Sequence, residues 1–409
     1  MMGRDEVGQR SETVRRANLS AIVRELHVDG PLSRSDLVAR TGLTRSAIRG
    51  LIGELATADL VSEERAVPLG TPGRPSPLVH LNPDAAVVLA LEIAVDSLAA
   101  ALVGLGGEVF ELIRVERPRG HSTVDDVVAD LAELAATIQG RHPSSELIGI
   151  GVTVVGLVRR TDGQVAMAPN LGWRDVPLVD VLAAALDTSA PIWIANDAEL
   201  GALAEVRRGA AVGESDILYI SGEVGVGGGA IVDGRPLLGA AGYAGEVGHI
   251  PVNPNGTACR CGSVGCWETE VGEGALLRRA GHPPGGGPDA VEAVIAEARD
   301  GSPAALSAFD DVGHWLGIGL AGLINILNPR LVLLGGRFGR IHPFVATTLE
   351  GELDRRVLPA PRRLVRVVPT ALGVDAPLLG AAELAFEPLL TDPATWLPPR
   401  DAFVDQASA

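Results

Sequence analysis

Apolar residues recur at helical spacing near the start of the chain, and turn residues separate the periodic stretches. The first stretch ends at Gly30, and its apolar positions are Leu19, Ile22, Val23 and Leu26. A helix with one apolar stripe must bury that stripe against other elements. We therefore expect a small packed domain at this end of the chain.

Two shorter helices are predicted after this stretch. Ser33 can cap a helix that ends near Gly42, and Thr44 can cap a second helix. The inward positions of that second helix are Ile48, Leu51, Ile52 and Leu55. Two short helices joined by a glycine-containing turn are typical of a helix-turn-helix, whose second helix reads DNA.

Residues 60–83 predict two short strands around a tip rich in glycine and proline. Such a hairpin is typical of the wing of a winged helix, and Arg74 at its tip could enter a minor groove. We expect DNA contacts from Ser33, Arg34, Thr44, Arg45, Ser46, Arg49 and Arg74. The alternative is a small helical domain that binds another protein and carries its arginines on a solvated face.

From Ala85 onward, β-branched runs alternate with Ala-rich helical stretches. The first half predicts three strands with a Gly-Gly turn in residues 85–118, a helix in 122–139, and strands in 147–156 and 190–197. The second half predicts strands in 216–222 and 227–237, a helix in 308–328, a strand in 330–336 and a closing helix in 373–386. This order is typical of the actin-like ATPase and sugar-kinase fold, a ribonuclease H-like α/β architecture of two lobes with a cleft between them.

Composition fits a folded protein of about two or three domains, since 46% of the 409 residues are hydrophobic. No apolar run reaches the roughly 18 residues that span a bilayer, and the polar N-terminus lacks the apolar stretch of a signal peptide. We expect a cytoplasmic protein with no membrane partner.

Charge is distributed unevenly along the chain. The net charge of -17 argues against a protein that binds nucleic acid over its whole surface. Residues 1–80 contain 11 arginines and 10 acidic residues, so the excess of acid lies in the remainder. Only the first segment can approach phosphate without strong repulsion.

All three cysteines lie within residues 259–266. An odd and local set of cysteines does not form a disulfide framework. Cys259, Cys261 and Cys266, together with His249, supply the three thiolates and one nitrogen that a closed, structural Zn2+ site requires. The alternative, small buried side chains around a core histidine, does not suit such a polar, Gly- and Asn-rich segment.

Five motifs of the body resemble the ROK family, the group of repressors, open reading frames and sugar kinases. They are APNLGW (168–173), IANDAELGALAE (194–205), GEVGVGGGAIVDGRPLLGAAGYAGEVGHIPV (222–252), CRCGSVGCWE (259–268) and INILNPRLVLLGG (324–336). The resemblance extends from about residue 85 to 385. With a winged helix in front, nearly the whole chain is similar to the transcriptional regulators of this family.

The resemblance implies the same four zinc ligands and a sugar site. In ROK proteins, the sugar is held by residues that match Asn170, Asn196, Asp197, Glu246, His249 and Glu268. Because each sugar hydroxyl both donates and accepts hydrogen bonds, its pocket needs such oriented polar groups. His249 would place one ring nitrogen on zinc and the other toward the ligand or its neighbours. For any one of the six, a helix cap or a solvated loop residue is the alternative.

Two tryptophans are further candidates for the pocket wall. Trp173 and Trp267 could line it with an apolar face, and packing in the core is the alternative for both.

The resemblance also raises the possibility of an enzyme, because Asp197 matches the base of ROK kinases. Those kinases bind the triphosphate at an Asp-x-Gly-Gly-Thr-type turn after the first strand. This chain has Ala94, Val95 and Asp96 there, and Glu223 and Val224 alter the second phosphate loop. Like charges about 4 Å apart repel by roughly 4 kcal/mol at an effective dielectric constant of 20, so we expect no catalytic residue and no enzyme.

The pattern divides the chain into four segments. Residues 1–82 are expected to form a winged helix-turn-helix, 83–199 the first lobe, 200–374 the second lobe with the zinc-binding loop, and 391–409 a C-terminal tail. A helix at about 375–390 should complete the first lobe.

We expect the protein to be a sugar-responsive transcriptional regulator, most simply a repressor. Its partners would be operator DNA and a monosaccharide or sugar-derived effector, and it would act as a homodimer or homotetramer. A sugar that enters the cleft would favour closed lobes, because a ligand stabilises the conformation that completes its hydrogen bonds. The alternative is an ATP-dependent sugar kinase with an appended DNA-binding domain.

Overall fold

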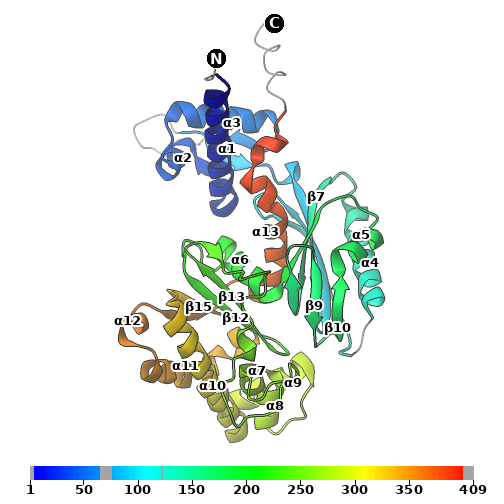
Figure 1. Ribbon diagram of the computed structural model, residues 1–409, viewed down its shortest axis with the longest axis vertical. Helices are drawn as coiled ribbons and strands as arrows, with labels where there is room; N and C mark the ends of the chain where they lie inside the picture. The colour runs from blue at the N-terminus through cyan, green and yellow to red at the C-terminus, as the bar shows by residue number, and fades with distance from the viewer. Residues whose placement is uncertain (1–3, 65–75, 121–122, 399–409) are drawn as a thin grey trace.

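The structure of the protein is a computed structural model that describes residues 4–64, 76–120 and 123–398. Three parts follow one another along its long axis: an N-terminal helical domain, a first α/β lobe and a second α/β lobe (Figure 1). None of the helices in the described ranges combines the length and the apolar character needed to cross a bilayer.

The N-terminal domain is a three-helix unit with a small sheet. Its elements are α1 (Arg4–Asp29), α2 (Arg34–Thr41), α3 (Arg45–Thr57), β1 (Leu32–Ser33), β2 (Val61–Glu64) and β3 (Leu78–Leu81). The three strands lie in the order β1-β3-β2, so the predicted hairpin gains a two-residue third strand that is too short for a sequence pattern to reveal. Arg74, the predicted tip of the wing, lies outside the described residues.

Helices α2 and α3 begin at the capping residues that the sequence predicts. The Ser33 hydroxyl accepts a hydrogen bond from the Asp36 amide at 3.1 Å, and the Asp36 carboxylate accepts one from the Ser33 amide. The Thr44 hydroxyl accepts a hydrogen bond from the Ala47 amide at 3.2 Å. Each cap satisfies a helix N–H that has no partner within the helix. The predicted inward positions of α1 and α3 are all buried.

The first lobe is a five-stranded sheet covered on both faces. Its strands are β4 (Val87–Ile93), β5 (Ser97–Gly104), β6 (Val109–Glu116), β7 (Leu147–Val154) and β11 (Ile192–Asn196), in the order β11-β7-β4-β5-β6. Val87, Leu89 and Leu91 pack with α4 (Val124–Arg141) and α5 (Leu178–Ala185). Val88 and Ala90 pack on the other side with α13 (Ala376–Thr391). Burial on both faces explains why β4 is apolar almost throughout.

A second, small sheet lies beside the first lobe and was not predicted. It contains β8 (Leu157–Arg159), β9 (Gln164–Ala168) and β10 (Trp173–Pro177), in the order β10-β9-β8. These strands are short and mix polar with apolar residues, so they give no clear alternation. The turn between β9 and β10 carries Asn170.

The second lobe repeats the plan of a five-stranded sheet between helices. Its strands are β12 (Ile217–Gly222), β13 (Val226–Val232), β14 (Arg235–Pro236), β15 (Leu331–Gly336) and β16 (Arg366–Pro369), in the order β14-β13-β12-β15-β16. Its helices are α6 (Asp197–Arg208), α7 (Trp267–Val271), α8 (Glu273–Arg279), α9 (Gly287–Arg299), α10 (Pro303–Leu327), α11 (Arg337–Arg356) and α12 (Pro359–Arg362). One face of the sheet packs on α10 and α11, and the other packs on α6.

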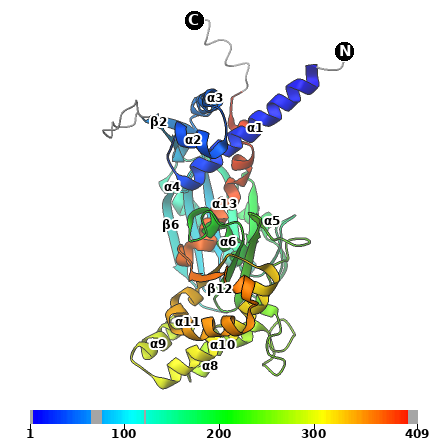
Figure 2. The same cartoon turned by 90° about the vertical axis from the view of Figure 1, so that its left-hand side faces the viewer.

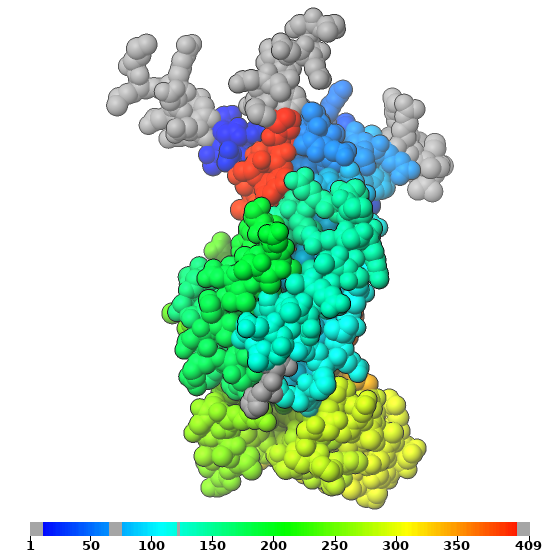
Figure 3. Space-filling model, turned by 90° about the vertical axis from the view of Figure 1, so that its right-hand side faces the viewer, coloured from blue at the N-terminus to red at the C-terminus, as the bar shows by residue number. Residues whose placement is uncertain are grey.

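The N-terminal domain is not an isolated unit. Its core residues belong to one continuous hydrophobic cluster with β4, β5 and α13. In Figure 2, α1 passes across the end of the molecule next to α13, and Figure 3 shows the N-terminal and C-terminal segments at the same end. The C-terminal helix therefore joins the first lobe to the N-terminal domain.

Candidate ligand pocket and metal centre

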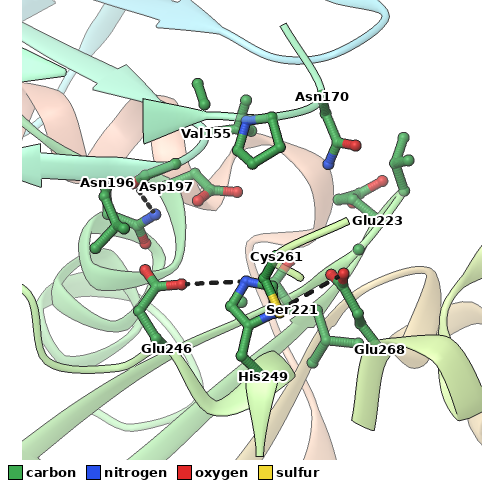
Figure 4. A pocket seen from close by; sticks show the side chains of 18 of the residues that line it. Val155, Asn170, Asn196, Asp197, Ser221, Glu223, Glu246, His249, Cys261 and Glu268 are labelled. Carbon is green, nitrogen blue, oxygen red and sulfur yellow. Dashed lines mark hydrogen bonds and ion pairs between the residues drawn. The ribbon is translucent and has the colours of Figure 1, made fainter. Parts of the chain in front are cut away.

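One pocket lies between the two lobes, and the six residues predicted to hold a sugar all line it. They are Asn170, Asn196, Asp197, Glu246, His249 and Glu268. They come from distant segments: the β9–β10 turn, the start of α6, the short helical turn at Val247–His249, and α7. Figure 4 shows that carboxylates, amides and the imidazole approach the pocket from opposite sides. The fold thus brings together side chains that the sequence spreads over almost a hundred positions.

Asn196 is held by the backbone around it. Its Oδ1 accepts hydrogen bonds from the amides of Ala198 at 2.9 Å and Glu199 at 3.3 Å, so it caps α6. Its Nδ2 donates to the carbonyl of Gly156 at 3.0 Å. The cap that the sequence offers as an alternative is therefore present, and one Nδ2 proton is left for a ligand.

Asp197 is half-buried at the first turn of α6. Burial raises the pKa of its carboxyl, the Ala198 amide lowers it, and the charges of Glu92 and Glu246 raise it, to about 7. Near neutral pH the group is present in both protonation states. It can therefore accept a hydrogen bond from a sugar hydroxyl, or donate one to it.

Three residues that line the pocket were not predicted from the sequence as ligand contacts. Ser221, Glu223 and Arg260 all line the pocket. Arg260 donates a hydrogen bond to Asn170 Oδ1 at 2.7 Å and so orients that amide. Its place between two cysteines was the available signal, because a metal-held loop fixes the side chains between its ligands.

The four predicted zinc ligands lie together beside the pocket. The donor atoms of His249, Cys259, Cys261 and Cys266 are all within 4.8 Å of one another. His249 Nδ1 lies 3.7 Å from Cys259 Sγ, and Cys261 Sγ lies 3.6 Å from Cys266 Sγ. Tetrahedral Zn2+ with bonds of about 2.3 Å to sulfur and 2.0 Å to nitrogen separates its donors by roughly 3.5–3.8 Å. The donor set and its spacing therefore fit a structural zinc ion.

The loop that carries the cysteines needs glycine at two points. Gly262 and Gly265 have φ of 95° and 69°, values that other residues rarely adopt. A Cβ on Gly265 would lie 1.6 Å from the Asn253 carbonyl oxygen. This close approach lets the two sides of the loop fold onto each other.

The metal group and the pocket share side chains. His249 Nε2 lies 3.7 Å from a Glu246 oxygen, on the pocket side of the ring. Glu268 Oε1 lies 3.0 Å from Cys259 Sγ and 3.9 Å from His249 Nδ1. Any ion held by these donors would fix the ring of His249 beside Glu246 and would lie close to Glu268.

Neither tryptophan lines the pocket. Trp173 is buried in the core of the first lobe. Trp267 is fully buried in the second lobe and donates its indole N–H to the carbonyl of Trp315 at 2.8 Å. Core packing was the correct alternative for both, because a large apolar ring stabilises the fold more when it is fully buried than when it lines a solvated pocket.

Comparison with known proteins identifies the family. The sequence profile of the ROK family matches residues 88–387.

The chain belongs to the ROK family.

Among curated relatives, the xylose repressor of Bacillus subtilis (strain 168) is 29% identical over 378 residues, which cover 92% of this chain and 97% of that repressor. The glucokinase of Streptomyces coelicolor is 30% identical over 319 residues, which cover 74% of this chain and 98% of that enzyme. The repressor therefore matches the N-terminal domain as well as the ROK body.

Solved structures divide in the same way. A ROK family transcriptional regulator, a homolog of the E. coli MLC protein, superposes with a TM-score of 0.76 at 28% identity over 92% of this chain and 97% of that one. A ROK glucokinase from Streptomyces griseus, in complex with glucose and AMPPNP, gives a TM-score of 0.65 at 29% identity over 74% and 99%. The expected ROK fold, including the helix-turn-helix in front, is confirmed.

Ion pairs cross between the lobes at the turn where ROK kinases bind phosphate. Arg119 donates to Asp96 at 2.8 Å and to Glu273 at 2.6 Å. Arg337 pairs with Glu273 and donates to the Glu223 carbonyl at 2.8 Å. The repulsion of roughly 4 kcal/mol expected from the sequence assumed an unpaired Asp96. Because Arg119 compensates that charge, repulsion alone does not exclude a phosphate group here.

The predicted DNA-contact residues fall into two groups. Thr44, Arg45, Ser46 and Arg49 are exposed at the start of α3. Within the described part of the chain, no ion pair involves Arg45 or Arg49. By contrast, both ends of the Arg34 guanidinium donate to Glu63 at 2.5 Å, and Ser33 is a helix cap. Arg34 thus fastens α2 to the hairpin instead of presenting a free charge.

Proposed function

We propose that this ROK protein is a cytoplasmic, sugar-responsive repressor. In this proposal the pocket binds a monosaccharide or a sugar derivative, and the N-terminal domain binds operator DNA as a homodimer or homotetramer. The observation that carries the proposal is the convergence of carboxylates, amides and an imidazole in one interlobe pocket, on a chain that also exposes a recognition helix. The similarity to xylose repressors over 92% of the chain supports it.

The pocket chemistry favours a polyhydroxylated ligand. Asn170 and Asn196 supply amide groups, Asp197 supplies a carboxyl near its midpoint of ionisation, and Glu246 adds a carboxylate. Groups that can donate and accept in fixed directions suit hydroxyls, which need both kinds of partner.

The role we propose for the metal is structural. Zn2+ held by His249, Cys259, Cys261 and Cys266 would fix the loop that carries Arg260 and the ring of His249. Four protein donors leave no open position for a water molecule or a substrate, so the ion would supply rigidity and no reaction step.

We further propose that the body does not phosphorylate its ligand. A triphosphate would have to compete with Asp96 and Glu273 for Arg119. The specific observation in favour of the other candidate, an ATP-dependent sugar kinase, is Asp197, whose pKa of about 7 suits a general base.

A coupled assay for ADP release with glucose, N-acetylglucosamine, mannose and xylose tests the kinase. We expect no turnover above that of the Asp197→Asn variant. Turnover that this variant loses would establish the enzyme instead.

An electrophoretic mobility-shift assay tests the repressor. Operator fragments selected from genomic DNA should be bound without sugar and released by at least one monosaccharide. The Asn170→Ala variant should bind the same operator and require a higher concentration of that sugar. An operator complex that is indifferent to every sugar contradicts the proposal.

A further inference from the structure

We propose that helix α6 couples the sugar pocket to the DNA-binding domain, with Arg208 at its last turn as the residue that fastens it to α1. This inference rests on the proposed function and names how the same pocket would control DNA binding. Its basis is that α6 begins in the pocket at Asp197 and ends in a buried contact with His27 of the N-terminal domain.

The buried contact joins three separate parts of the chain. Arg208 donates to Glu383 of α13 at 2.5 Å, to the Gly106 carbonyl at 2.7 Å and to the His27 carbonyl at 3.2 Å. His27 Nε2 lies 3.0 Å from the second oxygen of Glu383. The side chains of His27 and Glu383 are only 0% and 2% exposed. One guanidinium therefore connects the second-lobe helix, the C-terminal helix and the DNA-binding domain.

The hydrogen bonds of this contact are directional. The Gly106 amide donates to His27 Nδ1 at 3.0 Å, and His27 Nε2 lies 3.0 Å from a Glu383 oxygen and 2.7 Å from the Arg208 guanidinium. Burial raises the pKa of Glu383, but the opposing effect of His27 and Arg208 is larger and lowers this pKa to about 2. Glu383 is thus a carboxylate at neutral pH. A buried charge with fixed partners tolerates little displacement, because its hydrogen bonds, once broken, are not replaced by water.

Helix α6 is packed too tightly to absorb a movement of its first turn. A Cβ on Gly380 of α13 would lie 1.9 Å from the Leu200 carbonyl oxygen, and one on Gly229 of β13 would lie 2.5 Å from that of Ala198. No side chain fits at either crossing. Its 12 residues span about 18 Å, so α6 would transmit a shift as one rigid body.

The pocket end of α6 can respond to a ligand. Asn196 ties the first turn to Gly156 of the first lobe, while Asp197 faces the pocket. A sugar that binds more tightly when Asp197 is displaced would favour the displaced position of the whole helix. Arg208 would then move against His27, and the orientation of α1 would change with it.

A neighbouring ion pair provides a matched control. Arg16 of α1 donates to Asp392 at 2.9 Å, so it joins α1 to the C-terminal segment without touching α6. Loss of Arg16 weakens the same domain junction, but leaves the proposed connection in place.

The test measures operator affinity with and without saturating sugar, and sugar affinity without DNA, on the full chain. In Arg208→Lys, an ammonium cannot reach Glu383 and both carbonyl groups together. We expect sugar affinity and sugar-free operator affinity within about threefold of wild type, and at least a tenfold smaller effect of sugar on operator affinity. Arg16→Ala should keep the full sugar effect.

Several outcomes would overturn the coupling. One is an Arg208→Lys protein that keeps the full effect of sugar on operator affinity. Another is an Arg16→Ala protein that loses as much of this effect as Arg208→Lys does. If Arg208→Lys does not fold, His27→Gln tests the same contact from α1. Amide hydrogen exchange of the wild type gives a further readout: sugar should change exchange in α6 and in the last turn of α1, and unchanged exchange there contradicts the route. A wild type whose operator affinity ignores every sugar contradicts the proposed function itself, and the coupling falls with it.

Discussion

At the scale of single residues, Asp197 has the most informative environment. It is faced by carboxyl groups from three elements, Glu92 of β4, Glu223 after β12 and Glu246 before the zinc loop, and by Tyr219 of β12. These neighbours and its burial disfavour the ionised form. Sugar binding should therefore be linked to the protonation of this one group.

This linkage predicts stronger sugar binding at higher pH. A hydroxyl binds an ionised carboxylate more tightly than a neutral one, and the ionised fraction of Asp197 rises from about 10% at pH 6 to about 90% at pH 8. Sugar affinity, measured by calorimetry, should rise roughly tenfold over that range, because the competent fraction scales the observed affinity. Asp197→Asn should remove this rise. An affinity that is flat from pH 6 to 8 in the wild type would refute the assignment.

Residue types were easier to predict than residue partners. The six pocket residues could be named because a family pattern marks them, and their side chains do reach one pocket. The partner of Asp96 could not be foreseen, since Arg119 lies 23 positions away and Glu273 a further 154 positions on. The ion pair of Arg34 with Glu63, 29 positions away, could not be foreseen for the same reason.

At the scale of elements, the hydrophobic period and the caps predicted the N-terminal helices, α4, α10, α13 and most strands of the two main sheets, but not helices α5 to α9, α11 and α12. Ser33 and Thr44 begin the helices expected of them, and β4 to β7 lie where long apolar runs occur. The strands β8 to β10 and β16 escaped prediction. They have three to five residues each, and their pairing depends on turns and tertiary contacts that a short apolar run does not encode.

The exposed start of α3 predicts how operator binding responds to salt. Arg45→Ala and Arg49→Ala should each weaken operator binding, and removal of one arginine–phosphate interaction should reduce the slope of log affinity against log salt by about 1. Arg34→Ala is the control, because this arginine is held by Glu63. Fluorescence anisotropy at several salt concentrations gives the slopes. Unchanged affinity in both α3 variants would favour a protein partner for this domain.

The cysteine loop predicts a dependence of stability on metal. Cys261→Ser removes one of four donors, while Val264→Ala changes an exposed side chain of the same loop that offers no donor atom. At a hundred times its dissociation constant an ion adds about 2.7 kcal/mol, so Cys261→Ser should lower the melting temperature by roughly 5 °C. Elemental analysis should find about one Zn per chain in wild type and in Val264→Ala. Wild-type protein that contains no zinc would contradict the proposed metal site.

At the scale of the whole molecule, the N-terminal domain and the first lobe share one core. Phe386 of α13 contacts the His27 ring, and the Ser20 hydroxyl donates to the Leu390 carbonyl at 2.6 Å. A chain that begins at residue 83 would leave this surface of α13 uncovered. It should bind a dye specific for apolar surfaces and lose solubility relative to the full chain, as measured by dye fluorescence and sedimentation. A soluble, dye-silent fragment would show that the two parts are independent.

The position of α13 also bears on how the protein is made. Helix α13, which supports α1, follows it by more than 300 positions, so α1 is synthesised long before the helix that it packs against. A prematurely terminated product lacks that support and cannot hold its DNA-reading surface in place. A truncated product should therefore not bind operators in a form that no sugar can release.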